Sequence, residues 1–566
     1  MLRHKSPIRI AAFLASAGVG AVLTAAVAQV ALPEQVETTQ LSTDAFSTGT
    51  LDRFTGALPP TLWHGSDGQT LEYLLTQMPT RPASPSLGET MKRVLLSPGP
   101  GPQGAAVSLG GKKLLALARV GFADEARTVA SLSIASRGDP WTGQAEAVAD
   151  LLSGEVVAAC RRNANLSSGR DELFWVRLRA FCYAQAGEMD AADLTLAILR
   201  DQGALDASDT AFLTAAVTGA APKSPPAAKN ALQYAIARQL NLPFLPGLLD
   251  EADAGVLAAV ATDVSLDAAT RIAAAERAIA MGVMGPAVLS GLLQSVEFDV
   301  AEISNATGSA RDRAGDPLTD ALLYQSIGEM AAPEFLRDKA QRIALALSLG
   351  DSFHRAYSLS LLYADEIEAL EGAIVSADEA SSFAMARMAV GDSVGAGQWL
   401  AAMVGVNGGV TALPEAQAMA FIAQVNLLAV LDPQTAAQVA RVAGVSMLGE
   451  DGALASPSGH EDESTVALIM ETAFDAAING KQGQAGLAAL AASAGNAQGG
   501  EIESVIVGQS LRVAGLPQLQ RRYAFETAWA SKFSQAAGGD LANATGSAQA
   551  ENEGGLTPRL KPPVGQ

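Results

Sequence analysis

Residues capable of chemistry are few in this sequence. His64, Ser66 and Asp67 stand together in the segment LWHGSDG and supply the three residue types of a hydrolytic triad. A working triad, however, brings side chains together from separate segments, whereas Ser and Asp in one polar turn usually cap a helix. We therefore interpret the segment as a turn followed by a helix cap. We predict no catalytic residue in the chain and expect the protein not to be an enzyme.

Metal sites are equally poorly supported. His64, His354 and His460 are far apart, so no two of them have the four-residue spacing that places two zinc ligands on one helix face. The acidic residues between 451 and 463 lack the alternating ligands and the closing glutamate of a helix-loop-helix calcium site. We expect no metal ion, and we interpret the acidic segment as a solvated loop.

The glycine-rich segment 99–113 (GPGPQGAAVSLGGKK) invites comparison with a phosphate-binding loop. Ala106 occupies the position of the first required glycine, and Lys113 that of the required Ser or Thr. The pattern therefore fails, and a loop followed by a helix is the better interpretation. We expect no cofactor.

Cys160 and Cys182 are the only cysteines, and both fall on helix faces that we expect to be packed. In an oxidising compartment they could form a disulfide if their Cα atoms come within about 7 Å. Two buried thiols, each acting as a small apolar side chain, would satisfy the sequence equally well. Either role is structural, since no Cys-x-x-Cys pair of the redox type exists.

The elements that position Cys182 are two helices within residues 171–200. Apolar residues recur there at helical spacing, first on one face and, after a break at Gly187, on a second. The first face consists of Phe174, Leu178, Phe181 and Cys182, and the second of Ala192, Leu196 and Leu199. The segment therefore predicts a helical hairpin. In the same way, Asp316 and Pro317 predict a helix start, with the aspartate as cap.

The hairpin resembles a tetratricopeptide-repeat unit, because Ala180, Tyr183, Gly187 and Ala192 follow the order small, aromatic, turn glycine, small. The glycine-to-alanine spacing recurs without the aromatic in three further pairs: Gly121/Ala126, Gly391/Ala396 and Gly480/Ala485. The resemblance implies an all-α fold, an α-solenoid of antiparallel helical hairpins, whose surface grips an extended peptide or a partner helix.

Composition supports helices and excludes some functions. The 566 residues are 49% hydrophobic but only 5% aromatic, and they are rich in alanine, which favours closely packed helices. The formal net charge of −21 argues against nucleic-acid binding, which needs clustered Lys and Arg. The composition is similar to that of exported alphaproteobacterial proteins.

The pattern of the N-terminal residues predicts an export signal. Residues 1–9 are basic, residues 10–27 are apolar and uncharged, and Ala26-Val27-Ala28 has the small-x-small pattern of a cleavage site. Cleavage would occur between Ala28 and Gln29. Alternatively, residues 10–32 stay uncleaved as a membrane anchor. Either way we expect a periplasmic body, free or anchored to the inner membrane through residues 1–32.

Breaks in composition divide the chain into five parts. We predict a signal segment (1–28), a flexible spacer (29–61), an N-terminal helical array (62–219), a C-terminal helical array (227–536) and a disordered tail (537–566). The linker AAPKSPP at 220–226 separates the arrays. This organisation predicts an exported scaffold or adaptor for an unidentified protein partner. The alternatives are a membrane-anchored component of an envelope motility or secretion assembly and, less favoured, an envelope enzyme acting on peptidoglycan.

Overall fold

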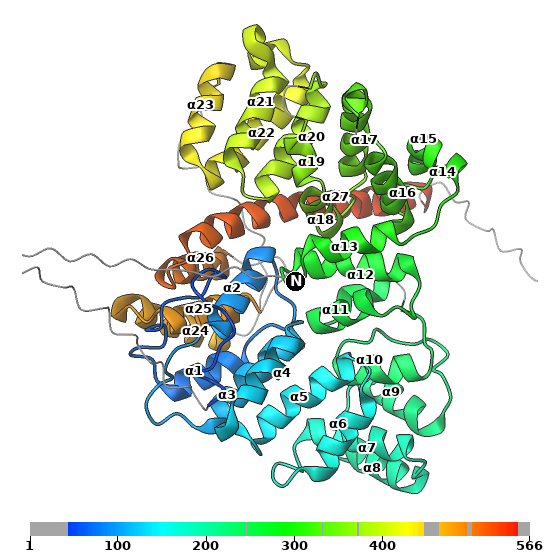
Figure 1. The fold of residues 1–566 in the computed structure, drawn as a ribbon, viewed down its shortest axis with the longest axis vertical. Coiled ribbons are helices and arrows are strands. Elements are labelled where there is room, and N and C mark those ends of the chain that lie inside the picture. The colour runs from blue at the N-terminus through cyan, green and yellow to red at the C-terminus, as the bar shows by residue number, and fades with distance from the viewer. Residues whose placement is uncertain are drawn as a thin grey trace, which may run out of the picture. The chain divides into compact units, whose positions relative to one another are not determined.

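The computed structural model is built from α-helices connected by short turns (Figure 1). It describes residues 44–244, 246–330, 332–370, 373–445, 463–494 and 501–552. Across these ranges there is no β-strand, so the predicted all-α class is confirmed. The described residues belong to one compact unit.

The helices follow one another with few long connections. The first nine are α1 (Gly68–Thr76), α2 (Pro85–Leu96), α3 (Val107–Arg119), α4 (Ala123–Leu132), α5 (Pro140–Leu152), α6 (Val156–Asn165), α7 (Leu173–Gln185), α8 (Met189–Asp201) and α9 (Ala207–Thr218). The next ten are α10 (Ala231–Gln239), α11 (Ala254–Thr262), α12 (Ala268–Ala280), α13 (Pro286–Gln294), α14 (Val300–Ser304), α15 (Ala306–Asp312), α16 (Pro317–Gly328), α17 (Leu336–Ser348), α18 (Phe353–Leu362) and α19 (Ala364–Glu368). The last eight are α20 (Ala377–Ala389), α21 (Ser393–Gly408), α22 (Glu415–Leu431), α23 (Pro433–Ala443), α24 (Glu463–Asn479), α25 (Gln482–Ala492), α26 (Glu501–Val513) and α27 (Pro517–Asn552). Single 3-10 turns are η1 (Ile134–Ser136), η2 (Pro246–Glu251), η3 (Pro333–Phe335) and η4 (Val410–Ala412).

Local chemistry explains where many helices begin. Asp139, Asp206 and Asp267 each accept a hydrogen bond from a backbone N–H of the first helical turn, which would otherwise lack a partner. The predicted start of α16 is confirmed, with Asp316 as cap and Pro317 at the first helical position.

The turn glycines of the four glycine-alanine pairs share one geometry. Their φ angles are positive, the left-handed region that glycine adopts without strain: 102° at Gly121, 77° at Gly187, 82° at Gly391 and 65° at Gly480. The residue after each glycine donates its N–H to the carbonyl five positions earlier, which closes the end of the helix. The alanine five residues after each glycine is buried. Short turns of this kind oblige consecutive helices such as α7 and α8 to run in opposite directions against each other.

Contacts also join helices that are distant in sequence. Helix α27 packs against α2, α22 and α26, and α25 packs against α1 and α2. Helix α12 packs against α18 as well as against its neighbours α11 and α13. After the exposed linker at 220–226, α10 packs against α5 and α9. The first, middle and last helices of the described chain therefore share one core.

Residues 44–61, which the sequence assigned to the flexible spacer, differ from that expectation. Ala45, Phe46 and Leu58 are buried, and Phe46 lies 4.8 Å from Trp63 between ring centroids. The segment's polar backbone is satisfied by the body of the protein, as when Ser136 accepts the N–H of Ala45 at 3.0 Å. Three buried apolar side chains within a Ser- and Thr-rich stretch, together with such hydrogen bonds, thus hold it in place.

The predicted signal segment 1–28, the Ala28–Gln29 cleavage site and the apolar stretch 10–32 lie outside the described residues. Among the helices that the structure does describe, none is both long and apolar enough to span a bilayer. At the other end, the backbone of α27 continues to Asn552. The rest of the predicted tail, 553–566, falls outside the described ranges.

Candidate functional site

The structure does not assemble His64, Ser66 and Asp67 into a triad. Asp67 caps α1 by accepting the N–H of Gln69 at 2.9 Å and that of Thr70 at 3.1 Å. Ser66 is buried, His64 is exposed, and no hydrogen bond joins any two of the three residues, all of which are described. The segment is a turn and a helix cap.

Lys113 of the glycine-rich segment 99–113 points into the protein. Its ammonium group donates hydrogen bonds to the carbonyl of Phe46 at 2.6 Å and to that of Thr48 at 2.7 Å. The side chain is fully buried, and burial lowers the pKa of Lys113 to about 7, although the charge of Asp44 opposes the shift. Lys113 holds the N-terminal segment and is not available to a phosphate.

Cys160 of α6 and Cys182 of α7 are joined by a disulfide, with Cα atoms 5.5 Å apart. The same two helices are linked by the buried side chain of Asn163, which donates to the carbonyl of Trp175 at 2.9 Å. The bond lies between packed helices, in keeping with a structural role.

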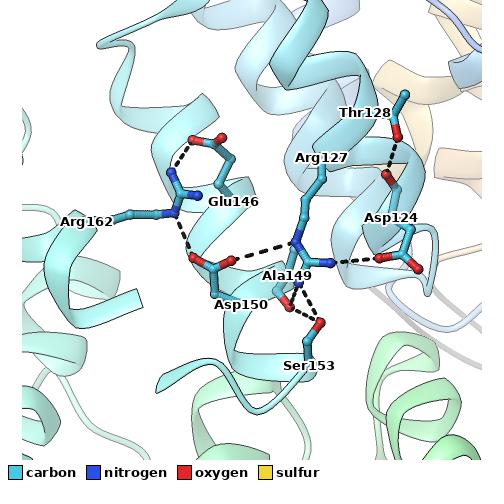
Figure 2. A network of polar contacts seen from close by, with 8 residues as sticks. All are labelled: Asp124, Arg127, Thr128, Glu146, Ala149, Asp150, Ser153 and Arg162. Atoms are coloured by element: carbon cyan, nitrogen blue, oxygen red, sulfur yellow. Dashed lines mark hydrogen bonds and ion pairs between the residues drawn. The ribbon is translucent and has the colours of Figure 1, made fainter. Parts of the chain in front are cut away.

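A network of ion pairs continues from α6 to α5 and α4 (Figure 2). Arg162 contacts Asp150 and Glu146, each at 2.7 Å, and Arg127 contacts Asp124 at 2.7 Å and Asp150 at 3.7 Å. Arg127 also donates to the carbonyl of Ala149 and the hydroxyl of Ser153. Each charged side chain of this network has a partner of opposite sign, so the network leaves little capacity for a ligand.

A second charged cluster was not visible in the sequence. Arg355 of α18 donates two hydrogen bonds, of 2.7 and 2.8 Å, to the carboxylate of Asp320 on α16, and Glu276 of α12 lies beside them. Burial, reinforced by the charge of Asp320, raises the pKa of Glu276 well above its usual range, which favours the neutral form of this carboxyl beside Asp320. In the sequence, only Glu276 indicates such a cluster, because it is a charged residue within an otherwise largely apolar helical segment (AAAERAIA).

This cluster is closed off from solvent. The side chains of Asp320 and Arg355 are 0% and 4% exposed, and Glu276 as a residue is 3% exposed. A buried pair of this kind joins helices and fixes their register.

The feature best suited to binding is an open cleft of about 570 Å³, lined by side chains of α15, α17 and α20. We call it the α17 cleft. Each helix contributes side chains three or four positions apart, which therefore lie on one helix face. The polar lining is Thr307 and Arg311 from α15, Asp338, Gln341, Arg342 and Ser348 from α17, and Asp378, Glu379 and Ser382 from α20.

The α17 cleft has an acidic end. Arg337 donates to the carbonyl of Ile374 at 2.8 Å and to Glu379 at 2.6 Å, so the starts of α17 and α20 lie side by side. Asp338 and Asp378 stand in the first turns of these two helices, where the helix dipole stabilises a negative charge. Asp378 also accepts a hydrogen bond from Gln417 at 3.0 Å, whereas the carboxylate of Asp338 has no partner in the described structure.

The cleft also has unused hydrogen-bonding capacity. Thr307, Arg311, Asp338 and Gln341 make no side-chain hydrogen bond or ion pair with any described part of the chain. Arg342 has a single long hydrogen bond, of 3.5 Å, to the carbonyl of Ser326. The residue types match those of the network in Figure 2, but here Glu379 alone among the charged lining side chains has an ion-pair partner, Arg337, in the described structure. This grouping could not be predicted from the sequence, because the side chains come from three separate helices.

No group of three or more His, Cys, Asp or Glu side chains within the described ranges is arranged to hold a metal ion. Comparison with known proteins adds no homologue: no family model matches the chain, and no curated protein or solved structure is significantly similar to it.

Proposed function

We propose that this protein is an exported scaffold or adaptor that binds a segment of a protein partner in the α17 cleft. The observation that carries the proposal is the lining of the cleft, where five side chains with unused hydrogen-bonding capacity face an open space. Arg311, Asp338 and Gln341 are exposed and Thr307 and Arg342 are half-buried, so a ligand in the cleft can replace the water around polar groups that the fold does not pair.

The proposal includes a solenoid-like arrangement of tetratricopeptide-like hairpins. It is supported by the identical turns at Gly121, Gly187, Gly391 and Gly480, each followed by a buried alanine. Such hairpins present rows of side chains from successive helices, which is how helical repeats grip extended segments.

The proposed location is the periplasm, with export directed by the basic and apolar residues 1–27. The disulfide between Cys160 and Cys182 supports an oxidising compartment, because cytosolic thiols are kept reduced. Mass spectrometry of the N-terminus tests the two versions. A peptide beginning at Gln29 supports a free periplasmic protein, whereas retention of residues 1–28 supports the anchored alternative.

A photo-crosslinking residue placed at Gln341 tests the proposed binding function in the producing cell. Gln509, an exposed glutamine of α26 outside the cleft, is the matched control position. We expect a discrete crosslinked protein from position 341 and none from position 509. Arg342→Ala should reduce the yield of the crosslink while leaving the unfolding midpoint unchanged.

The captured protein must then be purified and must bind the full chain directly, because capture alone could report a bystander. Equal crosslinking from both positions, or a crosslink at 341 whose yield Arg342→Ala leaves unchanged, would contradict the proposal.

A further inference from the structure

The α17 cleft separates its charges. Asp338 and Asp378 lie at the end where α17 and α20 begin, whereas Arg342 lies one helical turn further along α17. Arg311 of α15 also lines the cleft. No ion pair joins either arginine to an acid of the cleft in the described structure, so both signs of charge remain available to a ligand.

We propose that the partner segment is extended and carries a basic and an acidic side chain two residues apart. The basic side chain lies over Asp338 and Asp378, and the acidic side chain pairs with Arg342 and Arg311. This inference rests on the proposed function, because it names the chemistry of the segment bound at the same site.

The spacing follows from helix and strand geometry. Asp338 and Arg342 are four residues apart on α17, which corresponds to about 6 Å along the helix axis. In an extended peptide, side chains two residues apart point to the same side and are separated by about 6.6 Å. Adjacent residues point to opposite sides, so a directly adjacent pair of charges could satisfy only one end of the cleft.

Ligands of a single charge fit less well. A purely acidic segment would meet Asp338 and Asp378, which repel it, and a purely basic segment would meet the two arginines. An apolar ligand would find only Ala344 and Leu345 among the lining residues. It would also strip water from charged groups without replacing the lost hydrogen bonds.

The test uses the purified full chain and fluorescent peptides of equal length with identical neutral flanks. The central sequences are Lys-Ala-Glu, Glu-Ala-Lys, Lys-Glu, Lys-Ala-Lys and Glu-Ala-Glu, and anisotropy at low salt gives the dissociation constants. Both orders with two-residue spacing are included because the segment can enter in either direction. We expect the tighter of these two to bind at least about tenfold better than the adjacent and single-sign peptides, with binding weakened by added salt.

Double-mutant cycles then test which cleft residue pairs with each charged residue of the peptide. Arg342→Gln should weaken binding of the mixed-charge peptide about fivefold, and should have no effect once the peptide's Glu is replaced by Gln. Asp338→Asn should behave in the same way toward the peptide's Lys. Arg441→Gln, which removes an exposed arginine from α23 outside the cleft, is the control and should change nothing.

Equal or absent binding of all the peptides, or cycles without coupling, would overturn the mixed-charge assignment. The proposed function is tested separately, by the crosslinking experiment, and would be contradicted if no crosslink formed at position 341. A crosslinked partner whose segment shows no dependence on Asp338 would therefore reject this inference and leave the binding function standing.

Discussion

Ser86 of α2 donates two hydrogen bonds to the carboxylate of Glu526 of α27, although 440 positions separate the two residues in sequence. The backbone N–H of Ser86 lies 3.0 Å from one carboxylate oxygen, and its hydroxyl lies 2.9 Å from the other. Both residues are buried, and burial raises the pKa of Glu526. This contact ties one of the first helices to the last, whereas in a simple solenoid each repeat touches only its neighbours.

Replacing Glu526 tests how much the hydrogen bonds between Ser86 and Glu526 contribute to stability. Glu526→Ala leaves the N–H and the hydroxyl of Ser86 buried without an acceptor, and we expect a loss of about 3 kcal/mol in the free energy of unfolding. Denaturant unfolding followed by circular dichroism measures the change. Glu297→Ala, at an exposed glutamate, is the control and should cost less than about 0.5 kcal/mol. Equal effects of the two substitutions would show that the contact contributes nothing.

The disulfide gives a second prediction. Cys160 and Cys182 close a loop with a sequence separation of 22, for which chain entropy predicts a stabilisation of roughly 3 kcal/mol. We expect Cys160→Ser/Cys182→Ser to lower the unfolding midpoint and to speed hydrogen exchange in α6 and α7 before other helices. A reducing agent should reproduce the effect in the native chain and change nothing in the double variant. Unchanged exchange in α6 and α7 would argue against a stabilising bond.

Lys113 predicts a dependence of stability on pH. Its pKa is about 7 in the folded protein and about 10.4 in an unfolded chain, so between these values the unfolded chain binds more protons. The contribution of this group to stability must therefore rise with pH across that window and be flat below it. The unfolding free energy of the native chain minus that of Lys113→Met should increase by about 2–4 kcal/mol from pH 7 to pH 10.

The matched control for this prediction is Lys112→Met, next in sequence but paired with Glu72. The unfolding free energy of the native chain minus that of Lys112→Met should stay nearly constant over the same pH range. A flat difference for Lys113→Met would mean that the buried lysine titrates as it does in the unfolded chain.

The buried acids on α12 and α16 should respond unequally to isosteric substitution. The raised pKa of Glu276 favours its neutral form, which Glu276→Gln imitates while keeping a donor toward Asp320, so we expect a cost below about 1 kcal/mol. Asp320→Asn leaves Arg355 as a buried charge without its carboxylate, and should cost about 3–5 kcal/mol. Thermal unfolding of the two variants side by side measures the contrast, and equal costs would refute the protonated state of Glu276.

Helices, helix caps and turns, which depend on neighbouring residues, could be predicted from the sequence. The apolar spacing in residues 171–200 predicted α7 and α8, and Asp316 with Pro317 predicted the start of α16. The turn glycines were recognisable because each depends on a backbone conformation that few other residues adopt. The two cysteines could be singled out as a pair, but the choice between a disulfide and two thiols needed the distance between α6 and α7.

By itself, then, the sequence determined what depends on a few neighbouring residues: the helical class, many helix ends, and the basic and apolar N-terminus that predicts export. Tertiary structure alone decided which helix faces meet. That includes the hydrogen bonds between Ser86 and Glu526, the burial of Lys113 under residues 44–48, and the meeting of α15, α17 and α20 around a cleft. The physical reason is that periodicity reports which side of a helix is apolar, but carries no information about which distant helix covers that side. Charged residues such as Arg127 and Arg342 look alike in sequence, and only packing makes one a paired structural group and leaves the other open to a ligand.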